Sequence, residues 1–247
     1  MQSKSTSIRR AGQLAGLVLI ASFGLMSSLR AQVLEPPFDP RLLFQIPNQT
    51  PGSVQIIPLA DLPPQLREGF SLEAKQRREG LAERGTAQYF VSNAEPYALA
   101  LFNRLDSSMI SDRSALPGAF NGRVADIPST ADTQGMVWKG FAKEGPLTNE
   151  QSKRIYQVFA SPSGEMYALL QWNFVAAGAS ILAAKENMNA TINGQPGVMV
   201  VQVDGAGQSM WNLAWHAGEY WFELFASGLP VSPQSAAKIL RIASSVR

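Results

Sequence analysis

One histidine, five tryptophans and no cysteine limit the chemistry that this 247-residue sequence can perform. Without cysteine there is no disulfide, no thiol nucleophile and no cysteine-based zinc site. A Ser–His–Asp site would have to use His216, and the chain after residue 31 contains no Gly-x-Ser-x-Gly elbow to present a serine to it. His216 lies at the end of an expected hairpin, so we interpret it as a turn-flanking or hydrogen-bonding residue. We therefore expect no enzymatic activity.

The acidic residues and glycines do not indicate a cofactor either. Asp126 and Asp132 are the nearest candidates for an all-carboxylate metal site, but each is isolated in an expected loop. Metals held by carboxylates need several oxygen ligands close together. Gly205-Ala206-Gly207 lacks the third glycine and the following helix of a dinucleotide-binding loop, so it is interpreted as a strand connection. We expect neither a metal nor a cofactor.

The tryptophans are the strongest candidates for a binding site. Trp172, Trp211, Trp215 and Trp221 all fall in expected strands of the second half of the chain. Buried aromatic side chains dominate the energetics of protein cores, which favours a core position for them. The alternative is a cleft, lined by some of these four, for an acyl chain or a glycan. The sequence leaves both interpretations open.

The first 31 residues follow the three-part pattern of a secretory signal. A basic start is followed by an apolar run over residues 14–26, and Ala31 then offers a small residue before a cleavage point at Gln32. The apolar run is short for a membrane span of about 20 residues. An uncleaved anchor is the alternative, because Leu29 and Arg30 suit the cleavage point poorly.

Both alternatives place the rest of the chain outside the cytoplasm, as a periplasmic or secreted protein. Membrane contact is expected only through residues 11–26, and only if the signal is not cleaved. Removal of residues 1–31 takes away four basic residues and no acid, which changes the net charge from +2 to about −2. A nearly neutral mature chain does not favour nucleic acid as a partner. The four basic residues are Lys4, Arg9, Arg10 and Arg30.

Residues 32–64 are expected to form a proline-rich arm or linker. Proline fixes φ and lacks a backbone donor, so this stretch cannot be a regular helix or a central strand. Its apolar residues favour docking on a surface, either its own or a partner's, and a tether from the membrane is the alternative. The prolines are Pro36, Pro37, Pro40, Pro47, Pro51, Pro58, Pro63 and Pro64, and the apolar residues include Phe38, Leu42, Leu43, Phe44 and Ile46.

Residues 65–247 are expected to form one α+β domain; hydrophobic residues make up 45% of the chain, enough for a core. Interspersed charges over residues 65–84 predict a solvated helix. A strand is expected over residues 86–91 and a helix over about 94–105. Residues 106–135 carry turn signals and predict loops.

The main sheet is expected over about residues 135–227, as a series of antiparallel hairpins. Aromatic residues fall on both faces of its last strand, as Trp221 and Phe222 illustrate, so this strand is expected to be central and covered on both sides. The expected strands are 154–160, 165–175, a short strand ending in Thr191-Ile192 before an Asn193-Gly194 turn, 197–203, 209–216 and 219–227.

A helix is predicted over residues 232–246. Ser232 suits the N-cap and Pro233 the first helical position. Apolar residues then recur at spacings of three and four, and this stripe must cover another surface, for which the preceding sheet is the obvious candidate. The predicted fold class is α+β, an antiparallel sheet with helices packed on one face.

From Thr191 onward the chain resembles the C-terminal unit of LolA-like extracytoplasmic domains, including those appended to some anti-sigma factors. The resemblance rests on the turn of residues 191–196, the strand pair of residues 212–224, and the closing helix from Ser232 with Ala243 near its end. It implies a curved sheet wrapped on helices, sometimes with an apolar cavity for acyl chains and sometimes with a sensing surface. It brings no catalytic residues, and a cysteine-free chain lacks the anti-sigma zinc finger.

Three functional hypotheses follow. The first is an exported, non-catalytic binding or sensing protein of the cell envelope, for an apolar ligand such as an acyl chain. The second is an accessory subunit of an envelope protein complex, docking through residues 32–64. The third is a hydrolase that uses His216, which would lose its activity on His216→Ala.

Overall fold

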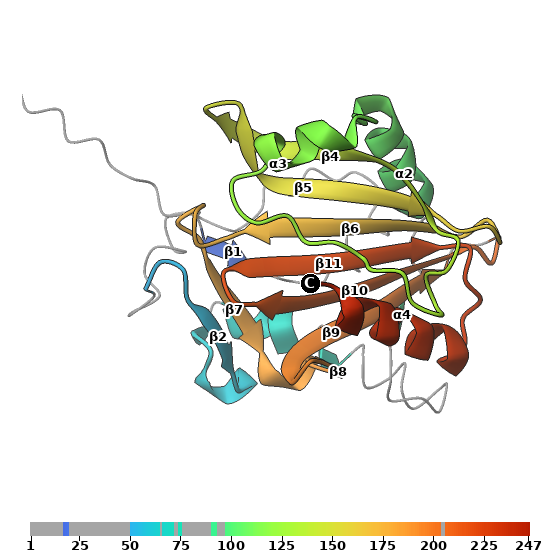
Figure 1. Cartoon of the computed structure of the whole chain (residues 1–247). Helices are drawn as coiled ribbons and strands as arrows, with labels where there is room; N and C mark the ends of the chain where they lie inside the picture. The colour runs from blue at the N-terminus through green and yellow to red at the C-terminus, as the bar shows by residue number, and fades with distance from the viewer. Residues whose placement is uncertain are drawn as a thin grey trace, which may run out of the picture.

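An eight-stranded sheet forms the centre of the computed structural model, which describes residues 17–19, 50–64, 66–71, 74–75, 90–92, 97–203 and 206–247. The strand order is β3-β9-β10-β11-β6-β5-β4, with β8 paired to β9 (Figure 1). Every pair is antiparallel except β3–β9, which is parallel. The α+β class with a large antiparallel sheet is therefore confirmed. The strands are β3 Phe90–Ser92, β4 Val137–Thr148, β5 Gln151–Ala160, β6 Met166–Asn173, β8 Ala190–Ile192, β9 Gln195–Val203, β10 Ser209–Ala217 and β11 Tyr220–Ser227.

β11 is the middle strand of this order, between β10 and β6. Its residues alternate between two covered faces, which is why the strand carries aromatic side chains at both odd and even positions. Phe222 and Leu224 belong to the cluster on one face, whereas Phe225 and Trp221 belong to clusters on the other. The expectation of a central strand covered on both sides is confirmed.

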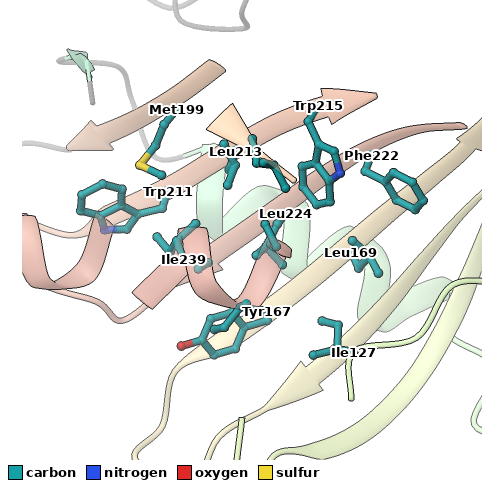
Figure 2. Packing of buried hydrophobic residues seen from close by; sticks show 14 of the residues in the cluster. Ile127, Tyr167, Leu169, Met199, Trp211, Leu213, Trp215, Phe222, Leu224 and Ile239 are labelled. Atoms are coloured by element: carbon teal, nitrogen blue, oxygen red, sulfur yellow. The ribbon is translucent and has the colours of Figure 1, made fainter. Parts of the chain in front are cut away.

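One face of the sheet is covered by α4, Pro233–Ser245. The Ser232 hydroxyl caps this helix by accepting a hydrogen bond from the Ser235 N–H at 3.1 Å. The apolar stripe of α4, which includes Ile239 and Ala243, packs on the core cluster that contains Trp211 and Leu224 (Figure 2). The predicted C-terminal helix and its docking on the sheet are confirmed.

The same face is also crossed by residues 121–127, here called the strap, which runs beside α4 in Figure 1. Buried amide side chains of the sheet hold it. Gln171 accepts a hydrogen bond from the Ala125 N–H at 2.8 Å and donates to the Arg123 carbonyl at 2.7 Å. Gln157 donates to the Ala125 carbonyl at 2.6 Å. The expected loop is thus irregular in backbone but fixed in place, because its polar groups are satisfied by the sheet.

Backbone hydrogen bonds join the strap to Arg247, which follows α4. The N–H of Asp126 donates to the carbonyl of Arg247 at 2.9 Å, and the N–H of Arg247 donates back at 3.3 Å. Residues just after α4 therefore pair with residues that precede β4.

The opposite face is covered at one end by α2, Tyr97–Ser108. Leu101 and Leu105 of α2 lie in one cluster with Leu170 and Phe225 of the sheet. Helices thus cover both faces, not the single face that we expected. The reason is the alternation of β11, which leaves two apolar faces that both require a cover.

A small parallel sheet covers the other end of that face, with the order β1-β7-β2. Its strands are β1 Leu17–Leu19, β2 Val54–Ile57 and β7 Ser180–Ala184. Ile181 of β7 clusters with Trp172 and Trp221 of the main sheet. β1 lies within the segment expected to be an export signal, and β2 lies within the proline-rich arm.

Residues 66–71 and 74–75 are helical, in the segment for which a charged helix was expected. Leu66 and Phe70 are buried against Leu182 of β7, so this segment has an apolar side as well as a charged one. Residues 76–84 of the expected helix, like most of the strand expected at 86–91, lie outside the described residues.

Four of the described strands have no counterpart among the expected ones: β1, β2, β4 and β7. β4 is interrupted by register shifts between Trp138 and Gly140 and between Glu144 and Leu147, which obscure its alternation. Among the described residues, no helix is long and apolar enough to cross a membrane. The remaining short elements are the 3-10 helices η2 Leu59–Asp61, η3 Arg113–Ala115 and η4 Lys185–Asn187, and the helix α3 Leu116–Ala119.

Candidate functional site

The four candidate tryptophans lie on two different faces of the sheet. Trp211 and Trp215 face α4 and are 0% and 3% exposed, and the ring of Trp215 stacks on Phe222 at 5.3 Å (Figure 2). Trp172 and Trp221 face the small sheet and are 6% and 5% exposed. The sheet separates the two pairs, so the four do not line one cleft. All four are core residues of the domain.

A carboxylate, Glu223, interrupts the apolar face that α2 and the small sheet share. It projects from the middle of β11 and is half-buried. Its Oε2 accepts a hydrogen bond from Asn212 Nδ2 and its Oε1 accepts one from Trp221 Nε1, both at 3.1 Å. Its neighbours across the strands are Ala214 and Leu170, whose side chains offer no hydrogen bond. Glu223 is the polar centre of an otherwise apolar surface.

Charged groups extend from Glu223 toward the edge of the sheet. Arg154 of β5 attracts Glu223 electrostatically, and its guanidinium carbon lies 4.8 Å from the ring centroid of Trp172. Arg154 also pairs with Glu144 of β4 at 3.6 Å, and Arg104 of α2 pairs with Glu144 at 3.4 Å. We call Glu223, Asn212, Arg154, Glu144 and Arg104 the polar seam.

The position of Glu223 disfavours its charged form. Burial raises the pKa of Glu223 above its ordinary value, and the hydrogen bonds from Asn212 and Trp221 and the attraction of Arg154 offset this only in part. The negative charge of Glu144 raises the pKa further. The seam therefore contains an acid that can take up a proton more readily than an exposed glutamate.

His216 lies on the same face of the sheet, opposite Trp221 on the neighbouring strand. Burial lowers its pKa, so the imidazole is neutral at pH 7. Its Nδ1 is buried and has no hydrogen-bond partner among the described residues, whereas a catalytic triad places a carboxylate there. The geometry does not support the hydrolase hypothesis.

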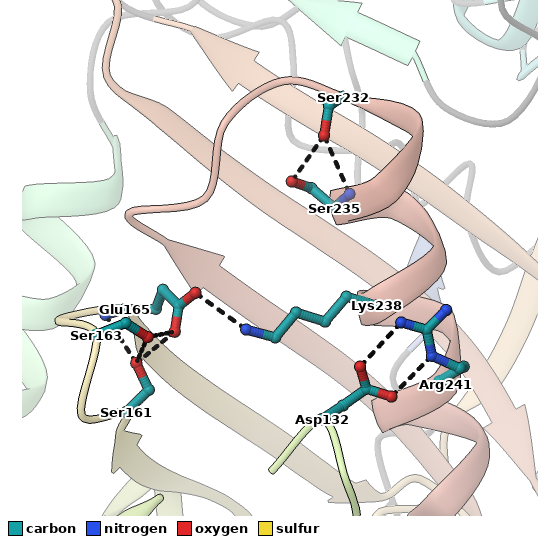
Figure 3. Close-up of polar contacts among 8 residues, drawn as sticks. All are labelled: Asp132, Ser161, Ser163, Glu165, Ser232, Ser235, Lys238 and Arg241. Atoms are coloured by element: carbon teal, nitrogen blue, oxygen red, sulfur yellow. Dashed lines mark hydrogen bonds and ion pairs between the residues drawn. The ribbon is translucent and has the colours of Figure 1, made fainter. Parts of the chain in front are cut away.

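A second polar cluster lies on the α4 side and fixes this helix (Figure 3). Glu165 accepts hydrogen bonds from the hydroxyls of Ser161 and Ser163 and from Lys238, whose Nζ is 3.0 Å away. Burial alone would lower the pKa of Lys238, but Glu165 and Tyr167 together outweigh burial and the pKa is raised. A protonated lysine cannot act as a base toward a serine, so this cluster is structural.

A hollow of about 190 Å³ lies between α2 and the β4 edge of the sheet. Its apolar lining is Phe102, Met109, Val158 and Met166, and its polar lining includes Asp106 and Lys139. In the part of the chain that the structure describes, no three of the residues that commonly ligate metals come together.

Glu223 is not among the candidate residues that the sequence pattern indicated. The available signal was an acid between Trp221 and Phe225 in a strand that is apolar on both faces. Comparison of the chain with protein-family models, curated proteins and solved structures finds no match. The resemblance to LolA-like domains, with its curved sheet, stays a prediction.

Proposed function

We propose that the protein is an exported, non-catalytic binding or sensing protein of the cell envelope, and that the polar seam is its recognition site. The observation that carries the proposal is Glu223, a half-buried carboxylate at the centre of the sheet. Export is proposed from the sequence pattern of residues 1–31.

A carboxylate at this position costs stability that an apolar residue would not. Desolvation of a charge is unfavourable unless it is paired, and the described residues give Glu223 two hydrogen bonds and the attraction of Arg154. Departures from a consistent apolar pattern and perturbed acids concentrate at functional sites. The seam is therefore the best-supported place for recognition.

An apolar ligand receives less support than a polar interaction. Trp172 lies with its ring centroid 6.1 Å from that of Phe174, and Trp215 stacks on Phe222, so these rings already pack against side chains of the domain. An acyl chain would have to displace part of the core, which is close-packed.

The test is native mass spectrometry of the mature chain, gently extracted from its own envelope fraction. We expect a reproducible bound mass on the wild type that is lost in Glu223→Gln and kept in Glu165→Gln, a matched change on the opposite face. A bare wild type, or a mass that both variants retain, would overturn the proposal. The mass of the chain itself tests export, because cleavage leaves Gln32 as the first residue.

The second candidate function, an accessory subunit of an envelope complex, is favoured by β2. This strand of the arm is an outer strand of the small sheet, and such a strand can pair with a partner's strand. Deletion of residues 32–49 leaves β2 in place, while deletion of residues 32–57 removes it. Under this hypothesis a partner protein stays bound when residues 32–49 are deleted and is lost when residues 32–57 are deleted. If the partner stays bound after both deletions, docking through the arm is excluded.

A further inference from the structure

The space around Glu223 restricts what the polar seam can recognise. Trp172 and Trp221, which border the seam on one side, are 6% and 5% exposed and pack with Ile181 of the small sheet. On the other side, Leu170 and Phe225 are buried beneath α2. Side chains of the domain fill both flanks of Glu223, which favours the smallest of ligands at this carboxylate and leaves a larger ligand to the more exposed part of the seam, Arg154, Glu144 and Arg104.

We propose that the proton is a ligand of the seam, and that Glu223 is the group that binds it; this rests on the proposed sensing function. The charged and titratable groups that face Glu223 are few. They are Arg154 on β5, Glu144 on β4, Arg104 on α2 and His216 on β10. The described residues of β6, β7 and β9 on this side are uncharged.

Protonation changes the hydrogen bonds of Glu223 in a defined way. The carboxylate accepts from two N–H donors, Asn212 Nδ2 and Trp221 Nε1. The neutral acid carries an O–H whose hydrogen cannot point at either of these donors, so the hydrogen bond accepted by the protonated oxygen is weakened. Rotation of the Asn212 amide would present its carbonyl oxygen to the new O–H. Arg154 then loses the attraction of Glu223 and keeps only Glu144.

The inference links the pH outside the cytoplasm to the border between α2 and the small sheet. Glu223 lies where the two covers of this face meet, between the clusters of α2 and of the small sheet. A change in its hydrogen bonds therefore acts on side chains from both clusters, Trp221 on one side and Phe225 on the other.

The test is a pH titration, by nuclear magnetic resonance, of the Trp221 indole N–H in the isolated mature chain. We expect a shift whose midpoint lies above the ordinary range of a glutamate, is absent in Glu223→Gln and is unchanged in Glu165→Gln. An indole resonance that does not titrate between pH 4 and pH 8, or that titrates alike in Glu223→Gln, would overturn the inference.

A second variant keeps the test decisive if Glu223→Gln does not fold. Asn212→Ala removes one donor that favours the carboxylate, so the midpoint must move to higher pH; an unmoved midpoint would contradict the inference. The titration needs no partner and tests only the binding of a proton, whereas native mass spectrometry tests the proposed function. Either experiment can fail while the other succeeds. The two proposals are therefore distinguishable.

Discussion

At Gly140, the edge of the main sheet passes so close to the end of α2 that no side chain fits. A Cβ atom there would lie 2.3 Å from Met109 Cγ and 2.8 Å from the Ile110 carbonyl oxygen. We expect Gly140→Ala to lower the free energy of unfolding by about 1–3 kcal/mol, because overpacking forces the backbone to shift. Urea denaturation measures this. Gly118→Ala is the control, since a Cβ there meets nothing within 4 Å; an equal loss in both variants would contradict the prediction.

The burial of the tryptophans gives a second prediction at the scale of single residues. In a Trp138→Phe variant the emission comes only from Trp172, Trp211, Trp215 and Trp221, all at most 6% exposed. We expect blue-shifted fluorescence with little quenching by acrylamide, and no change on addition of a fatty acid. Strong quenching, or a fatty-acid response that saturates, would restore the hypothesis of a cleft.

Among the elements, the strap depends on hydrogen bonds from the sheet more than on its own backbone. Gln171→Leu leaves the Ala125 N–H and the Arg123 carbonyl without their partner, and each unmet group costs about 1–3 kcal/mol. We expect a less stable domain and faster hydrogen exchange of the Ala125 amide. Gln134→Leu, at an exposed position in the turn that precedes β4, is the matched control and should change neither quantity. Unchanged exchange at Ala125 in Gln171→Leu would show that the strap is held by other contacts.

Elements with a strong local pattern could be predicted from the sequence, and elements without one could not. β10, β11 and α4 carry regular alternation or a capped apolar stripe, and all three are present. β4 was missed because glycine, proline and two register shifts break its pattern. β7 was missed because it is short and pairs in parallel with Val54–Ile57, far away in the sequence, so no hairpin turn announces it.

The candidate site was harder to predict than the fold, for a reason that also lies in the elements. Tryptophan attracts attention by its type, but its face is fixed by strand register, and the register divides the four between two faces. Glu223 gains its character from burial by α2 and β7. The apolar stripe of α2 predicts that the helix packs on a surface but not on which face of the sheet, and β7 was not expected. The burial of Glu223 could therefore not be predicted.

For the whole molecule, the two faces of the sheet should respond to pH with opposite signs. On the α4 side, hydrogen bonds from Ser161, Ser163 and Lys238 outweigh burial and lower the pKa of Glu165. The stability that Glu165 contributes is therefore present at neutral pH and is lost as the pH falls through its folded pKa. The pKa of Glu223 is raised in the folded state. The folded state therefore loses stability through Glu223 as the pH rises from the ordinary pKa of a glutamate to the higher pKa of the folded state.

Thermal unfolding of two matched variants between about pH 2 and pH 8, a range that includes the lowered pKa of Glu165, measures this difference. Relative to the wild type, we expect Glu223→Gln to gain stability as the pH rises, because the variant has no charge to desolvate. Glu165→Gln should instead lose stability over the same change, because the wild type gains its ion pair with Lys238. Two variants whose differences from the wild type run parallel would refute the assignment of opposite signs.

The position of the central strand determines when the sheet can be completed during synthesis of the chain. β11 joins β6 to β10 and ends at Ser227, and the backbone of Asp126 in the strap pairs with that of Arg247, after α4. Until that part of the chain is synthesised, the two halves of the sheet have no strand between them and their apolar faces lack α4. The main sheet is therefore incomplete until residues 220–227, which form its middle strand, have been synthesised.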